Sequence, residues 1–216
     1  MLERFRQFWT NVWAPLGNLF LRWGISPNTV TLVGTLGVVA GAVIFFPQGQ
    51  LLVGVLVITA FVFSDMIDGY MARTSGQVSV FGAFWDSTLD RVGDAAIFGG
   101  LAMYYVGPGD NDWFAALAIY CLSMGSVTSY ARARAESLGM QAKVGIAERA
   151  DRLVSILVIT GAADLVNRLG AGEDALWAIP VTLGALAIAS TVTVVQRVLV
   201  VRDQARALAA GPTPEA

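Results

Sequence analysis

The sequence predicts an all-α integral membrane protein whose chain crosses the bilayer six times. Of its 216 residues, 56% are hydrophobic and only 14% are charged, and the mean hydropathy is +0.63. A soluble domain has about 25% charged residues. Long stretches without any charge recur along the chain, and crossing a bilayer takes about 20 mostly apolar residues. This pattern excludes a soluble enzyme, a disordered chain and a basic nucleic-acid binder, so no nucleic-acid partner is expected.

The residue types that the chain lacks limit its chemistry. It contains no His and a single Cys, Cys121, which lies in an apolar stretch. An intrachain disulfide, a cysteine metal cluster and every mechanism that uses His are therefore excluded. Any metal ion must bind oxygen ligands, which favours hard divalent cations.

The charge-free stretches indicate where the six helices lie. Residues 23–64, 113–131 and 175–196 carry no charge, and the segment Pro47-Gln48-Gly49 divides the first stretch with a turn signal. The expected transmembrane helices cover about residues 28–46, 51–74, 82–106, 113–138, 148–166 and 175–202.

The two ends of the chain are expected to differ from this core. Apolar residues recur at helical spacing from Leu2 to Leu19, with arginines among the polar positions. Residues 1–22 are therefore predicted to form an amphipathic juxtamembrane helix that lies on the membrane surface. Residues 23–202 are the expected six-helix transmembrane domain. Residues 203–216 are expected to form a disordered cytoplasmic tail.

The basic residues indicate the orientation of the chain in the membrane. With six spans the two termini share a side, and 13 of the 14 basic residues fall on that side. Only Arg168 falls in a loop on the opposite side, where Asp110, Asp112, Glu173 and Asp174 also lie. Because basic loops remain in the cytoplasm, both termini are predicted to be cytoplasmic.

Four aspartates cluster on two consecutive helices. Residues three or four apart share a helix face, so Asp65 and Asp68 form one stripe and Asp86 and Asp90 form another. The short turn between the helices makes them antiparallel neighbours, which brings the carboxylates together near the cytoplasmic ends. Carboxylates at that depth repel each other unless cations neutralise them. The pattern therefore predicts Mg²⁺ or Mn²⁺, as one ion or a pair.

This acidic run resembles the signature of the CDP-alcohol phosphotransferases, D-x2-D-G-x2-A-R-x8-G-x3-D-x3-D. All eight fixed positions are present over 26 residues, namely Asp65, Asp68, Gly69, Ala72, Arg73, Gly82, Asp86 and Asp90. The resemblance implies six transmembrane helices, a homodimer and an active site on the cytoplasmic side of the membrane.

The same resemblance implies roles for individual residues. The metal ligands would be Asp65, Asp68, Asp86 and Asp90. Together they would hold two divalent ions, Mg²⁺ or Mn²⁺, and Asp90 would also act as the general base. The residues expected to bind CDP-diacylglycerol are Asn28, Thr31, Gly69, Arg73 and Ser79. Asp94 lies outside the signature and is expected to pair with Arg91.

A second cluster of charges bears on the acceptor alcohol. Arginines end the fourth helix, begin the fifth and lie near the end of the sixth, and such a cluster favours an anionic acceptor such as a phosphate monoester. The segments S-Y-A-R-A-R-A-E (129–136) and I-A-E-R-A-D-R-L (146–153) resemble the actinobacterial-type phosphatidylinositol phosphate synthases. That resemblance implies a bacterial plasma membrane and transfer of a phosphatidyl group from CDP-diacylglycerol to 1D-myo-inositol 3-phosphate. The residues expected to bind the acceptor phosphate are Arg132, Arg152 and Arg197.

Alternatives to this reading remain. Glycerol 3-phosphate is also a dianion, so the same class of enzyme could make phosphatidylglycerol phosphate instead. The arginines can also serve membrane topology or local ion pairs, as Arg152 could with Glu148. A cation channel or transporter is a more distant alternative, because it needs polar residues across the whole bilayer and the acidic residues stop at Asp94.

Overall fold

The computed structural model describes residues 13–210. Residues 1–12 and 211–216, together with the side chains of Asp65, Ala171 and Ala210, lie outside the description. Across residues 13–210 every regular element is a helix, as the composition predicts. The chain divides into two compact units, Met1–Gly109 and Asp110–Ala216.

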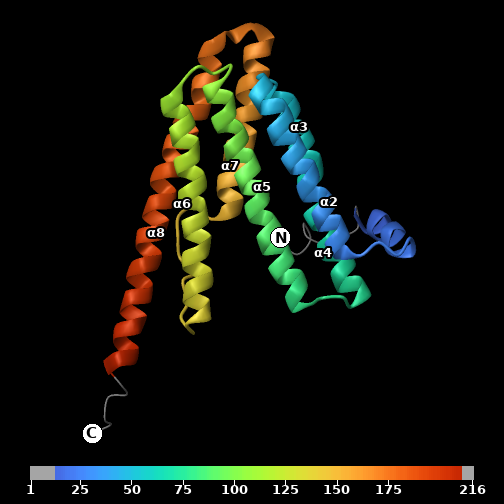
Figure 1. Cartoon of the computed structure of the whole chain (residues 1–216), viewed down its shortest axis with the longest axis vertical. Coiled ribbons are helices and arrows are strands. Elements are labelled where there is room, and N and C mark those ends of the chain that lie inside the picture. Colours follow the sequence, from blue (N-terminus) through green and yellow to red (C-terminus); the bar gives the residue numbers. More distant parts are fainter. Residues whose placement is uncertain (1–12, 211–216) are drawn as a thin grey trace, which may run out of the picture. The chain divides into compact units, whose positions relative to one another are not determined.

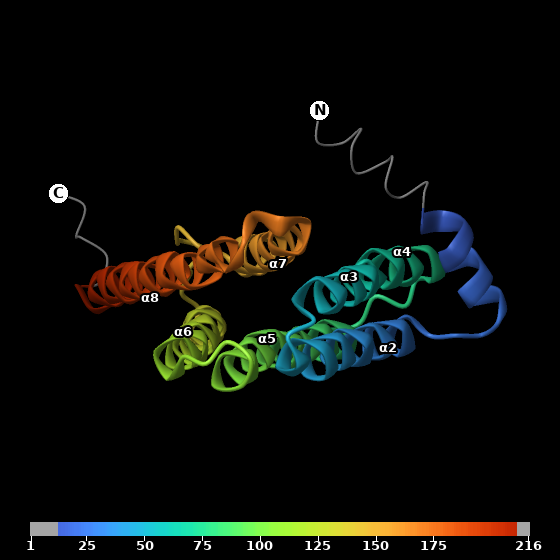
Figure 2. The same cartoon turned by 90° about the horizontal axis from the view of Figure 1, so that it is seen from above.

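The first unit is built around α2. Its elements are α2 (Pro27–Ala40), the π-helical turn η1 (Gly41–Phe45), the 3-10 turn η2 (Phe46–Gln48), α3 (Leu51–Val62), α4 (Ser64–Ser75) and α5 (Val80–Val106). Helix α2 contacts α3, α4 and α5, and Figures 1 and 2 both show α2 beside α3. The Ser26 side chain accepts a hydrogen bond from the Thr29 amide and so begins α2. Gly49, in the left-handed conformation, ends η2 at the turn that the sequence predicts.

Glycines on α2 and at the start of η1 allow α3 to approach closely. A Cβ atom on Gly37 would collide with the ring of Phe61, and one on Gly41 would lie 2.9 Å from the Ile58 side chain. Small residues at such positions let helix backbones pack closely in membrane proteins. Both glycines therefore serve contacts with α3 inside this unit.

Residues 13–22 form a helix that packs on the rest of the first unit. Trp13 and Phe20 contact a buried cluster made by Val30, Ile67 and Met71. The apolar side of this helix is thus anchored on α2 and α4. Residues 1–12 of the predicted amphipathic helix lie outside the described residues, and its contact with the membrane surface stays a prediction.

The second unit is built around α8. Its elements are α6 (Asp112–Ser137), α7 (Arg149–Val166), the π-helical turn η3 (Asn167–Ala171), the 3-10 turn η4 (Glu173–Trp177) and α8 (Ala178–Ala210). Helix α8 contacts both α6 and α7, and both figures draw it in red beside them. Asn111 begins α6 by accepting a hydrogen bond from the Phe114 amide. A capping box of Glu148 and Asp151 begins α7.

The end of α8 corrects one prediction. The expected disordered tail, residues 203–216, is wrong for residues 203–210, because α8 continues to Ala210. This stretch consists mainly of Ala, Arg, Leu and Gln, all of which favour helix. Residues 203–210 contain no Gly or Pro that could end the helix, and the next such residues are Gly211 and Pro212.

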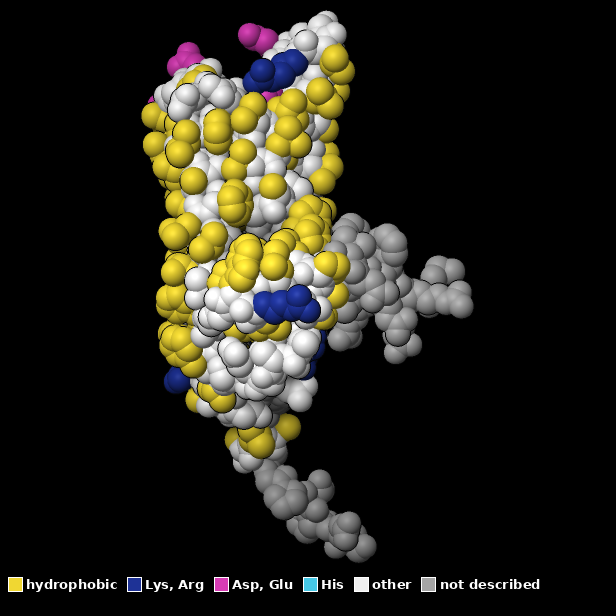
Figure 3. Space-filling view, turned by 90° about the vertical axis from the view of Figure 1, so that its right-hand side faces the viewer, with side chains coloured by type: hydrophobic (Ala, Val, Ile, Leu, Met, Phe, Trp, Pro, Cys, Tyr) yellow, Lys and Arg dark blue, Asp and Glu magenta, His cyan; other side chains and the backbone are white. Residues whose placement is uncertain are grey.

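Five helical stretches among the described residues are long and apolar enough to cross a bilayer. They are Pro27–Gln48, Leu51–Ser75, Asp112–Ser137, Arg149–Gly170 and Glu173–Ala209. The remaining predicted span, α5, has 27 residues, but Asp86, Asp90, Arg91 and Asp94 charge its first half. Hydrophobic side chains cover much of the face drawn in Figure 3. The protein is therefore a multi-pass membrane protein, and the count of six crossings stays a prediction.

Candidate active site

The two acidic helices of the first unit meet at a short turn, as their spacing predicts. Gly76, in the left-handed conformation with φ of 68°, ends α4. The Ser79 hydroxyl accepts a hydrogen bond from the Gly82 amide at 3.0 Å and so begins α5. The carboxylates of α4 and α5 thus lie on consecutive helices joined by four residues, 76–79.

A cavity of about 390 Å³ opens at this turn. It is lined by Pro27, Asn28 and Thr31 of α2, by Asp68, Gly69, Ala72 and Arg73 of α4, by Gln77, Val78 and Ser79 of the turn, and by Gly82, Ala83, Asp86 and Asp90 of α5. All five residues predicted to bind CDP-diacylglycerol line the cavity, and so do three of the four predicted metal ligands. The side chain of the fourth, Asp65, lies outside the description.

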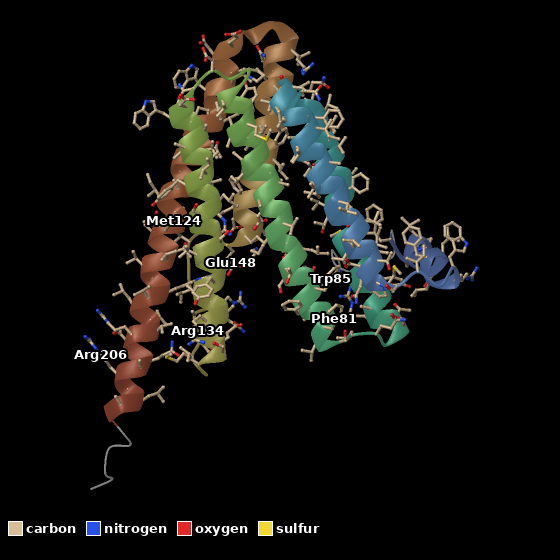
Figure 4. All side chains as sticks on the ribbon, viewed as in Figure 1. Phe81, Trp85, Met124, Arg134, Glu148 and Arg206 are labelled. Atoms are coloured by element: carbon tan, nitrogen blue, oxygen red, sulfur yellow. The ribbon has the colours of Figure 1, made fainter. Side chains whose placement is uncertain are left out.

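Hydrogen bonds from α2 and α5 fix the walls of this cavity. Asp68 is buried, and the Thr31 hydroxyl donates a hydrogen bond to its Oδ2 at 2.6 Å. On another wall, the Trp85 indole nitrogen donates to the Asn28 carbonyl at 3.2 Å. Figure 4 shows Trp85 with Phe81 on the first turns of α5. Because a buried carboxylate is costly without partners, the Thr31 hydroxyl holds Asp68 in one orientation.

Two glycines leave space beside the polar groups of the cavity. A Cβ atom on Gly69 would lie 3.3 Å from Arg73 Nη1, and one on Gly82 would lie 3.2 Å from the Ser79 hydroxyl oxygen. The guanidinium of Arg73 therefore lies close over Gly69. A guanidinium in this place can bind phosphate oxygens through two parallel hydrogen bonds.

The acidic stripe of α5 continues past the cavity. Arg91 Nε lies 3.5 Å from Asp94 Oδ2, and Arg91 Nη2 lies 3.8 Å from Asp90 Oδ2. The predicted pairing of Asp94 with Arg91 is confirmed. Asp94 is buried and, unlike Asp90, does not line the cavity, so its part is to support Arg91.

The donor atoms of the cavity suit a hard cation. Among the described side chains, which do not include that of Asp65, no three acidic groups lie close enough together to hold a metal ion. Asp68, Asp86 and Asp90 nevertheless face the same space and present only carboxylate oxygens. These are the ligands that Mg²⁺ and Mn²⁺ prefer.

In the second unit, the three predicted acceptor-binding arginines differ in burial. Arg132, near the end of α6, is partly exposed, and its Nε lies 3.0 Å from Glu136 Oε1. Arg152 and Arg197 are only 2% and 4% exposed. Arg132 and Glu148 both lie near enough to Arg197 to interact with its charge. Figure 4 shows Glu148 just before α7 and Arg134 near the end of α6.

The two buried arginines bind the backbone of their own unit. Arg152 Nη1 donates to the carbonyl of Ala147 at 3.1 Å, and Arg197 Nε donates to the carbonyl of Val144 at 3.0 Å. Arg197 Nη1 also donates to the carbonyl of Thr128. The sequence did not predict these bonds, because the path of the loop between α6 and α7 cannot be derived from residue spacing.

Other residues of the cavity were also missed by the sequence analysis. Gln77 and Val78 line it from the turn, and Trp85 supports it through Asn28. The signature leaves these positions variable, so no pattern marked them.

Comparison with known proteins agrees with the signature. The family described as CDP-alcohol phosphatidyltransferase matches residues 24–201. This chain belongs to that family. Because the chain belongs to the CDP-alcohol phosphatidyltransferase family, it is a transferase. The family match spans residues of both compact units.

The chain is similar over nearly its whole length to proteins named phosphatidylinositol phosphate synthase. One from Streptomyces avermitilis is 50% identical over 206 residues, which cover 94% of this chain and 84% of that relative. One from Cutibacterium acnes is also 50% identical over 206 residues, covering 94% of this chain and 98% of the relative.

Solved structures of a Mycobacterium tuberculosis phosphatidylinositol phosphate synthase also resemble this CDP-alcohol phosphatidyltransferase. The crystal structure with CDP-DAG bound matches with a TM-score of 0.81 at 37% identity and covers 88% of this chain and 94% of that chain. The crystal structure in complex with manganese and citrate matches with a TM-score of 0.78 at 37% identity and covers 87% of each chain.

Proposed function

We propose that this enzyme transfers the phosphatidyl group of CDP-diacylglycerol to 1D-myo-inositol 3-phosphate, giving phosphatidylinositol phosphate and CMP. The observation that carries the proposal is that one cavity is lined by Asn28, Asp68, Arg73, Asp86 and Asp90 together. It joins acidic groups for a cation with a guanidinium and glycine-lined space for a pyrophosphate. The names of the relatives support inositol phosphate as the acceptor.

The cavity would hold divalent metal ions on its carboxylates. The proposed ligands are Asp65, Asp68, Asp86 and Asp90, and the oxygen-only donor set fits Mg²⁺, with Mn²⁺ as a substitute. Two ions are proposed. When bound, they neutralise the pyrophosphate and the charge that develops on the leaving CMP. Manganese in the structure of a relative supports this choice.

The side chains of the cavity have distinct roles in the proposed reaction. Arg73 binds phosphate oxygens of CDP-diacylglycerol, and Gly69 allows the pyrophosphate to approach the backbone. Asn28, Thr31 and Ser79 bind the rest of the CDP group. Asp90 accepts the proton from a hydroxyl of the acceptor. The acceptor oxygen then forms a bond to the β-phosphorus, and the bond from that phosphorus to the oxygen of CMP breaks.

The acceptor phosphate is proposed to bind the arginines of the second unit. Arg132 is partly exposed and can exchange its pairing with Glu136 for a phosphate. Arg197 has five N–H groups, of which two donate to backbone carbonyls. The remaining N–H groups of Arg197, together with Arg152, can donate to phosphate oxygens.

The cellular setting is part of the proposal. The resemblance to actinobacterial synthases favours a bacterial plasma membrane. The distribution of basic residues favours both termini in the cytoplasm, and CMP would be released on that side. The enzyme is proposed to act as a homodimer, as the family resemblance implies.

The test is release of CMP by the purified protein. CDP-diacylglycerol and Mg²⁺ are supplied with one acceptor at a time, namely inositol 3-phosphate, inositol, glycerol 3-phosphate or serine, and Asp90→Asn serves as the blank. We expect release with inositol 3-phosphate alone. Release with glycerol 3-phosphate alone would keep the chemistry of the aspartates and overturn the proposed acceptor. No release with any acceptor, from folded protein, would favour the transport alternative.

A further inference from the structure

Side chains on one face of α8 form hydrogen bonds with the backbone of the loop between α6 and α7. Thr193, Arg197 and Gln204 are four and seven residues apart along the helix, so they share a face. Thr193 binds residues 146 and 147, Arg197 binds residue 144, and Gln204 binds residue 141. The loop therefore runs antiparallel to α8 and is attached at three successive points.

Thr193 is the innermost of the three points. It is fully buried, and its hydroxyl donates to the Ala189 carbonyl at 2.8 Å. The same oxygen accepts hydrogen bonds from the amides of Ile146 and Ala147, each at 3.2 Å. A threonine hydroxyl has one donor and two acceptor positions, and all three are used. Neither Val nor Ala could make the two bonds to the loop.

Gln204 makes the outermost point. Its Oε1 accepts a hydrogen bond from the Gln141 amide at 2.9 Å, and its Nε2 donates to the Gln141 carbonyl at 2.6 Å. A side-chain amide here pairs with the backbone of a single residue, as a neighbouring strand would in a sheet. This contact lies in the part of α8 beyond residue 202.

The loop lies directly against Thr193. Gly145 has φ of 146°, a conformation that side chains rarely adopt, and a Cβ atom there would collide with the Thr193 side chain. The loop backbone could not reach the Thr193 hydroxyl with a larger residue at this position. The sequence of the loop and the face of α8 are therefore matched to each other.

The loop in turn sets the place of a proposed acceptor-binding arginine. It leads directly into the capping box of α7 at Glu148, and the buried Arg152 donates to the Ala147 carbonyl at 3.1 Å. The Ala147 amide is one of the two that Thr193 binds. Thr193 is thus two hydrogen bonds away from the Arg152 guanidinium.

We propose that Thr193 is a positioning residue for the anionic acceptor: it fixes residues 146 and 147 and, through them, the guanidinium of Arg152. The proposal rests on the proposed function, in which Arg152 binds the acceptor phosphate. Under this proposal, the preference of the enzyme for its acceptor depends in part on Thr193, which does not itself contact the acceptor.

The test compares Thr193→Val with Thr193→Ser and Thr182→Val. Val keeps the volume and removes both bonds to the loop, whereas Ser keeps the hydroxyl. Thr182 is a matched control, since it lies on the same helix, is only half-buried, and its hydroxyl donates to the Ala178 carbonyl. Steady-state CMP release gives kcat and both KM values, and hydrogen exchange of peptides covering residues 141–148 reports on the loop.

We expect Thr193→Val to raise the KM for inositol 3-phosphate roughly tenfold, with kcat and the KM for CDP-diacylglycerol changed less than about twofold. Exchange in the loop should become faster in the same variant. Thr193→Ser should restore both readouts, and Thr182→Val should resemble the wild type. A general loss of folding would instead lower kcat and affect both substrates.

Two results would overturn the proposal. One is unchanged exchange in the Thr193→Val loop, and the other is faster exchange with an unchanged acceptor KM. If the wild type uses glycerol 3-phosphate and not inositol 3-phosphate, the proposed acceptor fails, and the same comparison with glycerol 3-phosphate decides the role of Thr193. If the wild type releases no CMP with any acceptor, the proposed function and the role in acceptor binding are both overturned, while the exchange data still report whether Thr193 holds the loop.

Discussion

At the scale of single residues, the chemistry of the candidate site depends on how one carboxylate is held. Asp68 is buried, and the Thr31 hydroxyl reaches it from another helix at 2.6 Å. The family resemblance assigns Thr31 to the nucleotide, whereas the structure also gives it a contact with a proposed metal ligand. Hydrogen bonds to metal ligands orient them and tune their affinity for the ion.

Replacing Thr31 should therefore weaken the response of the enzyme to metal. In Thr31→Val, we expect the Mg²⁺ concentration that gives half-maximal CMP release to rise roughly tenfold to a hundredfold. Thr31→Ser, which keeps the hydroxyl, should stay near the wild type. Thr35→Val is the control one turn along α2, because the Thr35 hydroxyl donates only to the Thr31 carbonyl. An identical Mg²⁺ dependence in Thr31→Val and wild type would contradict the assignment.

At the scale of elements, the loop between α6 and α7 is held by side chains that bind its backbone. Thr193 and Arg197 bind its amides and carbonyls from α8. Buried backbone groups without partners are costly, so these side chains let the loop pass close to α8. Helix α8 has to extend past residue 202 to reach Gln141 with Gln204.

Two glycines of this loop allow a matched test of that packing. Both Gly139 and Gly145 have positive φ, at 76° and 146°, but a Cβ atom meets nothing within 4 Å at Gly139 and collides with Thr193 at Gly145. We expect Gly139→Ala to cost about 1 kcal/mol for backbone strain alone.

Gly145→Ala should cost about 1–3 kcal/mol more. Its φ of 146° is less accessible to a side chain than the left-handed conformation of Gly139, and the added Cβ atom would also overpack against Thr193. Thermal unfolding in detergent, followed by helical circular dichroism, measures the difference. Equal unfolding temperatures for the two variants would show that the loop does not press on α8.

At the scale of the whole molecule, each compact unit carries one part of the proposed function. The first unit holds the acidic cavity, which is lined by the residues proposed to bind the nucleotide. The second holds the buried arginines and the loop that they bind. Residues of both units fall within the family match at 24–201, which agrees with a reaction that needs a donor and an acceptor.

The orientation of this membrane protein can be tested with two introduced cysteines. Asp112 and Arg206 are both exposed and lie at opposite predicted sides of the membrane. The native Cys121 is buried and should give little background. In intact cells, an impermeant maleimide should label Asp112→Cys, whereas Arg206→Cys should need permeabilised cells. The reverse pattern would overturn the cytoplasmic assignment of the termini.

The helices themselves could be predicted closely because the bilayer imposes their length. The expected helices 82–106 and 113–138 are observed as α5 (Val80–Val106) and α6 (Asp112–Ser137). The end of α8 differs from the prediction. The Ala, Gly and Pro of residues 203–216 predict disorder, but Gly and Pro come only after residue 210, and α8 continues to that point.

The sequence by itself determined the chemistry of the first unit. Spacings of three and four residues on two helices joined by a short turn leave few ways to arrange the carboxylates. Seven of the eight residues that the signature fixes line the cavity. Only the tertiary structure decided what the buried Arg152, Arg197 and Thr193 bind. Their partners are backbone groups of a loop, and every residue has the same backbone groups, so no pattern of side chains in the sequence can reveal such contacts.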